Sequence, residues 1–221
     1  MNILIKFPSR GRPDKFKDTF NTYVNLVSGL HNIQFICSFD QDDILMNNID
    51  IKNFLDNHKF PIYYYYGNSS NKIEAINADM NKINYEYDIL ILAADDLYPV
   101  QENYDNIIVK DMLDNHSDMD GCLHYMNPNW EEKLDIGCVM TKKYFDRFNY
   151  IYHPSYKTIY CDNEYMDVAK LLGKHRYIPK QIFMHNYVVS DPTADRNWIY
   201  NNEDEQNYNH RKQNHFYLGN I

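Results

Sequence analysis

The stretch Asp88-Ile-Leu-Ile-Leu-Ala-Ala-Asp-Asp96 decides the fold of this chain, because it joins an unbroken apolar run directly to two carboxylates. Residues 89–93 show no alternation of polar and apolar side chains, which is typical of a strand buried on both faces in a parallel sheet. Ligands of such sheets bind just beyond the carboxyl ends of the strands. Asp95 and Asp96 therefore lie where a site is expected, and their oxygen atoms suit Mg²⁺ or Mn²⁺. The alternative is a plain turn, since Asp commonly ends a strand.

The segments on either side of this run alternate between strand and helix patterns. In the first half they predict a helix of undefined bounds between the second and third strands, strands at 3–7, 33–39 and 61–66, and helices at 16–30 and 73–83. In the second half they predict an irregular polar arm from residue 191 that ends in a short helix, helices at 104–112 and 161–172, and strands at 122–126, 136–140 and 182–188. This order predicts an α/β fold with a Rossmann-like, mostly parallel central sheet flanked by helices.

Composition narrows the class of protein. The chain has 221 residues without a linker-like segment or a repeat, so a single domain is expected. Its 31 acidic residues outnumber its 22 Lys and Arg residues, and the formal charge of −9 argues against a large nucleic-acid surface. The sequence shows no apolar run as long as a membrane span and no signal-peptide pattern, so we expect a soluble, cytoplasmic protein. The 4 cysteines are widely spaced, which indicates reduced, buried thiols.

Four features resemble the GT-A class of nucleotide-sugar glycosyltransferases, in particular glycosyltransferase family 2 and its short members in bacterial and viral genomes. They are the loop Phe7-Pro-Ser-Arg-Gly-Arg-Pro13, the Asp40 loop, the strand end Ala94-Asp-Asp96, and Cys161-Asp-Asn-Glu164 followed by Ile182-Phe-Met-His185. The resemblance covers nearly the whole chain, and a viral member would act in the host cytoplasm. It implies one GT-A-like domain over residues 1–221, with a nucleotide-binding half (1–100), an acceptor-side half (101–190) and a C-terminal arm (191–221).

The resemblance also implies a metal-dependent donor site. In this class an Asp-x-Asp motif and a late His bind Mn²⁺ or Mg²⁺ on the donor diphosphate, which makes Asp96 and His185 the expected metal ligands. Ala94 stands where the first Asp of the motif is expected, so Asp95 is left to contact ribose or a metal-bound water. By itself, His185 is more typical of a core or edge position. The candidate cations for the phosphates are Arg10, Arg12, Lys72 and Arg196. The residues expected to contact the donor are Pro8, Ser9, Arg10, Arg12, Asp40, Lys72, Asn77 and Asp95.

The acceptor side is less well defined by the sequence. Asp162 and Glu164 are the candidate general bases, because a carboxylate can take the proton of an acceptor hydroxyl. Both residues also suit the first turn of a helix, where a carboxylate satisfies N–H groups and meets the helix dipole. Trp130 and Gly137 are expected to border the acceptor, with Trp130 either a sugar-stacking platform or a partly buried anchor.

The sequence thus predicts a divalent-metal-dependent glycosyltransferase that moves a sugar from a nucleotide-diphosphate donor, with UDP preferred, to a hydroxyl acceptor. The acceptor is expected to be a glycan, with a modified nucleobase as the alternative. A candidate carboxylate base favours inversion, and retention stays open. Two other functions also stay open. One is a non-catalytic nucleotide-sugar or glycan-binding module, which Ala94 favours; the other is a sugar-1-phosphate nucleotidyltransferase, for which the segment Ser9-Arg-Gly-Arg-Pro13 is too short.

Overall fold

A seven-stranded sheet forms the centre of the molecule in a computed structural model that describes residues 1–186 and 198–219. Its strand order is β3-β2-β1-β4-β7-β6-β8, and a separate two-stranded sheet joins β5 to β9. The strands are β1 (Asn2–Pro8), β2 (Asn32–Asp40), β3 (Ile62–Gly67), β4 (Ile89–Leu92), β5 (Leu97–Pro99), β6 (Cys122–Tyr125), β7 (Val139–Thr141), β8 (His175–Ile178) and β9 (Phe183–His185).

Parallel pairing dominates the half of the large sheet that contains β3, β2, β1 and β4. Strand β1 pairs in parallel with β2 on one side and β4 on the other, and β2 pairs in parallel with β3. Strand β7 runs antiparallel to both β4 and β6, whereas β6 and β8 are parallel. All four residues of β4 are buried, as the apolar run predicts. Because β1, β2 and β4 end at the same edge, the loops after them converge there.

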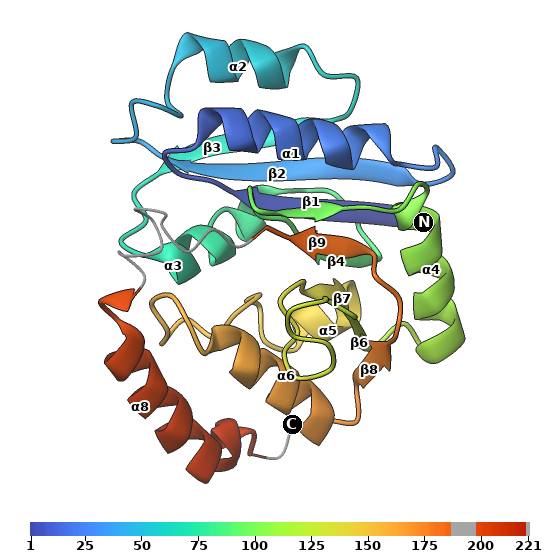
Figure 1. The fold of residues 1–221 in the computed structure, drawn as a ribbon, viewed down its shortest axis with the longest axis vertical. Coiled ribbons are helices and arrows are strands. Elements are labelled where there is room, and N and C mark those ends of the chain that lie inside the picture. Colours follow the sequence, from blue (N-terminus) through green and yellow to red (C-terminus); the bar gives the residue numbers. More distant parts are fainter. Residues whose placement is uncertain (187–197, 220–221) are drawn as a thin grey trace.

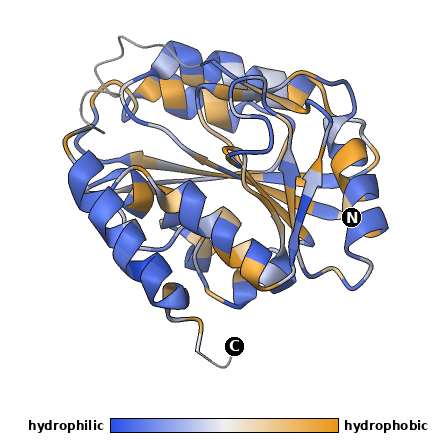
Figure 2. Ribbon diagram, turned by 60° about the horizontal axis from the view of Figure 1, so that its bottom comes forward, coloured by the Kyte–Doolittle hydropathy of each residue, from blue (hydrophilic) through white to orange (hydrophobic). Residues whose placement is uncertain are grey.

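Helices cover both faces of the sheet (Figure 1). The apolar core of one face joins the strands to α1 (Pro13–Asn25), α2 (Ile49–Asp56) and α4 (Tyr104–Asn115). The core of the other face joins them to α3 (Lys72–Asn77), α5 (Lys142–Asp146) and α6 (Cys161–Leu171). Figure 2 shows the hydrophobic strands enclosed between helices whose outer sides are hydrophilic. The arrangement confirms the predicted fold class. Among the described residues, no helix is long and apolar enough to cross a membrane.

The helix predicted over residues 73–83 is broken. Helix α3 ends at Asn77, and a separate 3-10 helix, Met80–Lys82, follows. The break lies at Asp79, which has a left-handed φ of 66°. Its carboxylate accepts a hydrogen bond of 2.6 Å from the Ser38 hydroxyl and pairs with Lys82 at 2.6 Å. Apolar spacing alone does not reveal this polar interruption.

Other departures lie in the second half of the chain. Strand β8 and helix α5 were not predicted, because His-Arg-Tyr-Ile and a five-residue helix carry little periodicity. Strand β9 covers only part of the predicted strand 182–188, whose last two residues lie outside the described ranges. The described part of the arm contains a helix of 13 residues, α8 (Asn201–Gln213), where a short one was predicted. All four cysteines are free and buried, as predicted.

Candidate donor and metal site

The carboxylates after β4 lie beside the loop that follows β1. Asp95 accepts hydrogen bonds from the Ser9 hydroxyl at 3.2 Å and from the Arg12 guanidinium at 2.9 Å. The hydroxyl of Thr19, on α1, donates to the main-chain carbonyl of Asp95 at 3.0 Å. The parallel register of β1 and β4 brings these segments together. The structure therefore joins three of the predicted donor residues in one cluster, and Pro8 closes β1 next to them.

Asp95 and Asp96 differ in their electrostatic surroundings. Burial raises the pKa of Asp95 to about 6, against the opposing charge of Arg12. Burial also acts to raise the pKa of Asp96, but His185 and Lys72 outweigh it and hold that pKa below its ordinary value. Near neutral pH, Asp96 is therefore fully ionised, whereas Asp95 is close to its titration range. This difference favours Asp96 over Asp95 as a direct ligand of a cation.

The β5–β9 ribbon places His185 next to Asp96. In its antiparallel register Leu97 pairs with His185, and the N–H of Asn186 donates to the main-chain oxygen of Asp96 at 2.8 Å. The distance between His185 Nε2 and Asp96 Oδ2 is 3.8 Å. Ligand atoms lie roughly 2 Å from Mg²⁺, so two atoms less than about 4 Å apart are close enough to reach the same ion. Both atoms can therefore bind one cation.

Protein atoms supply only part of a coordination shell here. Within residues 1–186 and 198–219, no group of three or more His, Cys, Asp or Glu side chains could hold a metal. Mg²⁺ usually keeps several waters and completes its shell with substrate phosphates. The donor set of Asp96 and His185 thus fits a cation that arrives with a diphosphate, and it does not form a closed structural metal site.

Lys72 and Asp162 belong to the same electrostatic cluster. Lys72 is exposed at the first position of α3, and its charge acts to lower the pKa of both Asp96 and Asp162. Burial raises the pKa of Asp162 in the first turn of α6, while Lys72 and His185 oppose that rise. A carboxylate with a raised pKa beside a cation is suited to accept a proton. Arg196, the other candidate cation, lies outside the described residues.

Arg10 and Asp40 are held in a fixed network. Arg10 Nη1 donates to Asp40 at 2.7 Å, and the guanidinium makes two further bonds to Asp42 at 2.7 and 2.9 Å. The second oxygen of Asp40 accepts from the N–H of Ser69 at 3.0 Å. The carboxylate of Asp43 binds the N–H of Gly11 at 2.6 Å. Asp42 and Asp43 were not predicted as site residues, although the run Asp40-Gln-Asp-Asp43 signals an acidic loop.

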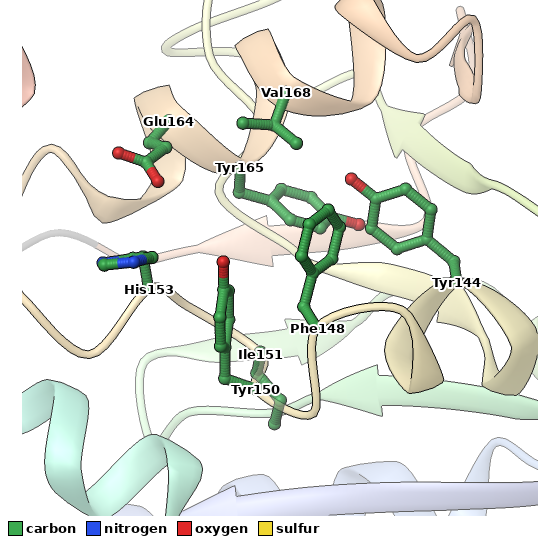
Figure 3. Close-up of a pocket in the computed structure, with 8 residues that line it drawn as sticks. All are labelled: Tyr144, Phe148, Tyr150, Ile151, His153, Glu164, Tyr165 and Val168. Carbon is green, nitrogen blue, oxygen red and sulfur yellow. The ribbon is translucent and has the colours of Figure 1, made fainter. Parts of the chain in front are cut away.

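Glu164 is not brought into the cluster around Asp96. Its side chain, 4% exposed, takes a two-pronged bond from Arg211, with Nε to Oε2 at 2.7 Å and Nη2 to Oε1 at 2.8 Å. The Tyr156 hydroxyl donates to the same carboxylate at 2.6 Å. Figure 3 shows Glu164 and His153 at one end of an aromatic cavity of about 20 Å³, room for one water. The geometry therefore favours Asp162 over Glu164 as the candidate base.

Three other predicted site residues, Asn77, Gly137 and Trp130, have surroundings of their own. The Asn77 amide binds the backbone of the distant loop between α5 and α6, donating to Tyr152 O at 2.7 Å and accepting from the N–H of Ile151 at 2.8 Å. Gly137 is buried, and a side chain there would meet Leu97 and Phe183 within 4 Å. Trp130 lies in the turn after β6 and is 44% exposed, which leaves its ring accessible.

A polar pocket of about 250 Å³ adjoins Asp95 and Asp96 on the side of α1. The sequence analysis missed its other residues, because they belong to the polar face of α1 and to the β5–β9 ribbon. They are Lys15, Asp18, Thr19, Thr22, Tyr98 and Asn186. The helical spacing of the α1 residues was the available signal, but on its own it marks an ordinary solvated face.

Solved structures share this fold at low sequence identity. A mannosyltransferase, PcManGT, from Pyrobaculum calidifontis, in complex with GDP-Man and Mn²⁺, aligns with a TM-score of 0.66 and 9% identity, over 88% of this chain and 59% of its own. Glucosyl-3-phosphoglycerate synthase from Mycobacterium tuberculosis, with Mg²⁺ and UDP, aligns with a TM-score of 0.59 and 11% identity, over 88% and 74%. The chain thus spans about three-fifths of the first of these proteins.

A nucleotidyltransferase has the same architecture. The 4-diphosphocytidyl-2C-methyl-D-erythritol synthase from Anaerococcus prevotii aligns with a TM-score of 0.55 and 11% identity, over 87% of this chain and 92% of its own. No family model and no curated protein matches the sequence. The predicted likeness to the GT-A nucleotide-sugar glycosyltransferases is therefore confirmed as a likeness of fold.

Proposed function

We propose that this protein is a divalent-metal-dependent glycosyltransferase that uses a nucleotide-sugar donor and a hydroxyl acceptor. One observation carries the proposal: Asp96 Oδ2 and His185 Nε2 lie 3.8 Å apart at a strand-end edge of a GT-A-like sheet. Lys72 acts electrostatically on both Asp96 and Asp162 beside them. Two ligands for a divalent cation, a cationic side chain for the phosphates and a carboxylate base suit an inverting glycosyl transfer.

The chemistry divides among these side chains. Asp96 and His185 would hold Mn²⁺ or Mg²⁺, whose positive charge would offset the negative charge of the departing nucleoside diphosphate. Lys72, exposed at the start of α3, adds a second positive charge from the protein. Asp162 takes the proton of the acceptor hydroxyl, whose oxygen bonds to the anomeric carbon as the bond to the diphosphate breaks. Attack on the face opposite the leaving group inverts the anomeric centre.

The donor is held by loops that are already ordered. The bonds of Arg10 to Asp40 and Asp42 and the bond of Gly11 to Asp43 fix the loops after β1 and β2 before a nucleotide arrives. Preorganised loops lower the cost of ordering on binding. UDP is the proposed nucleotide. Ser9 and Arg12 meet the phosphate and ribose side through their contacts with Asp95.

Calorimetry with UDP and with GDP, each with and without Mn²⁺, tests the donor and metal parts together. Metal-dependent binding of UDP is the expected result, and Asp42→Asn is the matched variant that keeps Asp96 and His185 intact while weakening the Arg10 network. Tight binding of GDP and not of UDP would change the proposed donor nucleotide from UDP to GDP. Absence of nucleoside diphosphate binding in Mn²⁺ would reject the glycosyltransferase.

The acceptor is proposed to be a glycan. Trp130 offers an accessible aromatic ring after β6, and sugars pack their apolar faces on such rings. A glycan array read with radiolabelled donor, comparing wild type with Trp130→Ala, tests this point. A loss of transfer to glycans with unchanged donor hydrolysis is expected. Transfer to a nucleobase substrate, and to no glycan, would replace the proposed acceptor.

A sugar-1-phosphate nucleotidyltransferase is the second candidate, because a nucleotidyltransferase matches nearly its full length to this fold. Such an enzyme releases pyrophosphate from a nucleoside triphosphate. Incubation with UTP or CTP and sugar phosphates, read by pyrophosphate release, separates the two activities. We expect no release, since the loop between β1 and α1 is short.

A further inference from the structure

Helix α8 is bound to the rest of the molecule through polar contacts. Asp204 is its one buried residue, and the helix that leads to the C label in Figure 2 is hydrophilic along nearly its whole length. It lies beside α6 (Figure 1). Tyr208 and Lys212 bind Asp167 of α6 at 2.7 and 2.8 Å. Polar groups, and not an apolar stripe, therefore decide where α8 sits.

Asp204 reaches from α8 into the loop before α6. Its carboxylate accepts hydrogen bonds from three successive backbone N–H groups, those of Lys157 at 2.9 Å, Thr158 at 2.8 Å and Ile159 at 3.0 Å. The side chain is fully buried. Hydrogen bonds from N–H groups to a carboxylate are strong, and a buried carboxylate that lost them would be left without partners. Asp204 therefore holds α8 and the loop before α6 in one arrangement.

The same loop connects to both sides of the proposed reaction centre. The carbonyl of Lys157 accepts the N–H of Ile73 at 3.2 Å, in the first turn of α3 directly after Lys72. At its other end the loop passes through Tyr160, in the left-handed conformation with φ 58°, into the first turn of α6 and Asp162. The residues that Asp204 holds therefore set the spacing between Lys72 and Asp162.

We propose that Asp204 is a positioning residue for catalysis: through residues 157–159 it fixes the base Asp162 relative to the cation Lys72. The inference rests on the proposed glycosyl transfer, in which those two groups act together. In Asp204→Asn, one carboxylate oxygen becomes an NH₂ group that faces N–H donors. The loop then loses part of its anchor, and Lys72 and Asp162 are no longer held at a fixed spacing.

Steady-state kinetics with saturating Mn²⁺ test the proposal against a matched variant, Asp167→Asn, which weakens the α6–α8 contact without touching the 157–159 loop. We expect Asp204→Asn to lower kcat about tenfold to a hundredfold, because small misplacements of reacting groups cost this much, and to change the donor KM less than about threefold. Asp167→Asn should keep both constants within about threefold. If Asp204 were merely structural, both variants would have a lower melting temperature, and Asp204→Asn would not show a fall in kcat at a nearly unchanged donor KM.

Amide hydrogen exchange gives a readout that does not depend on activity. In Asp204→Asn, residues 71–78 and 157–165 should exchange faster than in the wild type, whereas in Asp167→Asn these segments should be unchanged. If Asp204→Asn proves too unstable, Thr158→Val removes the 3.3 Å bond from the Thr158 hydroxyl to Asp204 and keeps the Asp204 carboxylate, so it should give the same pattern at smaller amplitude.

The outcomes separate the two proposals. Absence of transfer by the wild type would reject the proposed glycosyltransferase activity. The exchange data alone would then test whether Asp204 holds residues 157–159 and α3 in place. Unchanged exchange at residues 71–78 in Asp204→Asn, or a wild-type kcat in that variant, would overturn the role of Asp204.

Discussion

Two regions of the molecule hold carboxylates beside an arginine: the partly exposed strand-end cluster of Asp95 and Asp96 with Arg12, and the buried Glu164 with Arg211 at the α6–α8 contact. In the second region the pairing is close and two-pronged, at 2.7 and 2.8 Å. In the first, Asp96 lies 3.7 Å from Arg12 and 3.8 Å from His185, beyond hydrogen-bond distance. Asp96 can therefore bind a cation without first breaking a short ion pair, whereas the charge of Glu164 is already balanced by Arg211.

The largest expected effect lies at Asp96. We expect Asp96→Ala to lower transfer by about three orders of magnitude, because a metal's charge stabilisation of several kcal/mol is lost. The melting temperature should change little, since the contacts of the Asp96 side chain with its neighbours are long. Transfer assays with Mn²⁺ and in EDTA check both parts. Wild-type turnover in Asp96→Ala, or full activity in EDTA, would show that Asp96 does not bind a catalytic cation.

The second test contrasts Asp162 with the nearby Glu164. Asp162→Asn should lower kcat at least about a hundredfold while donor binding is kept, as expected when a general base is lost. Donor affinity measured by calorimetry serves as the control. Unchanged transfer in this variant would reject the carboxylate base and favour a retaining mechanism.

The third test addresses the α6–α8 contact itself. Glu164→Gln leaves the buried Arg211 without its charge partner, and we expect a loss of about 3 kcal/mol of unfolding free energy. Turnover below the melting transition should stay within a few-fold of the wild type. Urea unfolding and transfer rates on the same samples check this. A loss of turnover with unchanged stability would instead indicate that Glu164 acts as the general base.

The smallest expected effect concerns the pH dependence of stability at Asp95. Because the folded protein keeps the Asp95 proton up to a pKa of about 6, whereas the unfolded chain releases it near 3.8, this group lowers stability as pH rises through that window. Asp95→Asn removes the effect, so its stability relative to wild type should rise by roughly 2–2.5 kcal/mol between pH 4 and pH 8. Melting curves in EDTA measure it. A constant difference across that range would show that Asp95 is ionised throughout.

The two regions also differ in what the sequence reveals. Asp95 and Asp96 follow an apolar strand directly, and Ser9 and Arg12 follow another, so local pattern and the geometry of parallel sheets suffice to predict that they meet. The central strands and most helices were predicted for the same reason. By contrast, nothing local to Glu164 indicates Arg211.

Several features that the sequence pattern did not reveal depend on polar side-chain contacts rather than on apolar periodicity. Helix α8 docks through charges, so it lacks the apolar periodicity by which helices are recognised. The amide of Asn77 and the carboxylate of Asp204 bind backbone groups of distant loops, and side-chain type does not identify such partners. The break at Asp79 follows from its bonds to Ser38 and Lys82.

The β5–β9 ribbon has a consequence for how the protein acquires its site during folding. It places His185 next to Asp96 from the far side of the chain, and a slip of one residue in its register would turn the imidazole to the opposite face. If a cation binds these two residues, as we propose, it would act as a reversible cross-link between distant segments. At a hundred times its dissociation constant it would stabilise the native state by about 2.7 kcal/mol. Chelators should therefore change the unfolding rate of the chain as well as its activity.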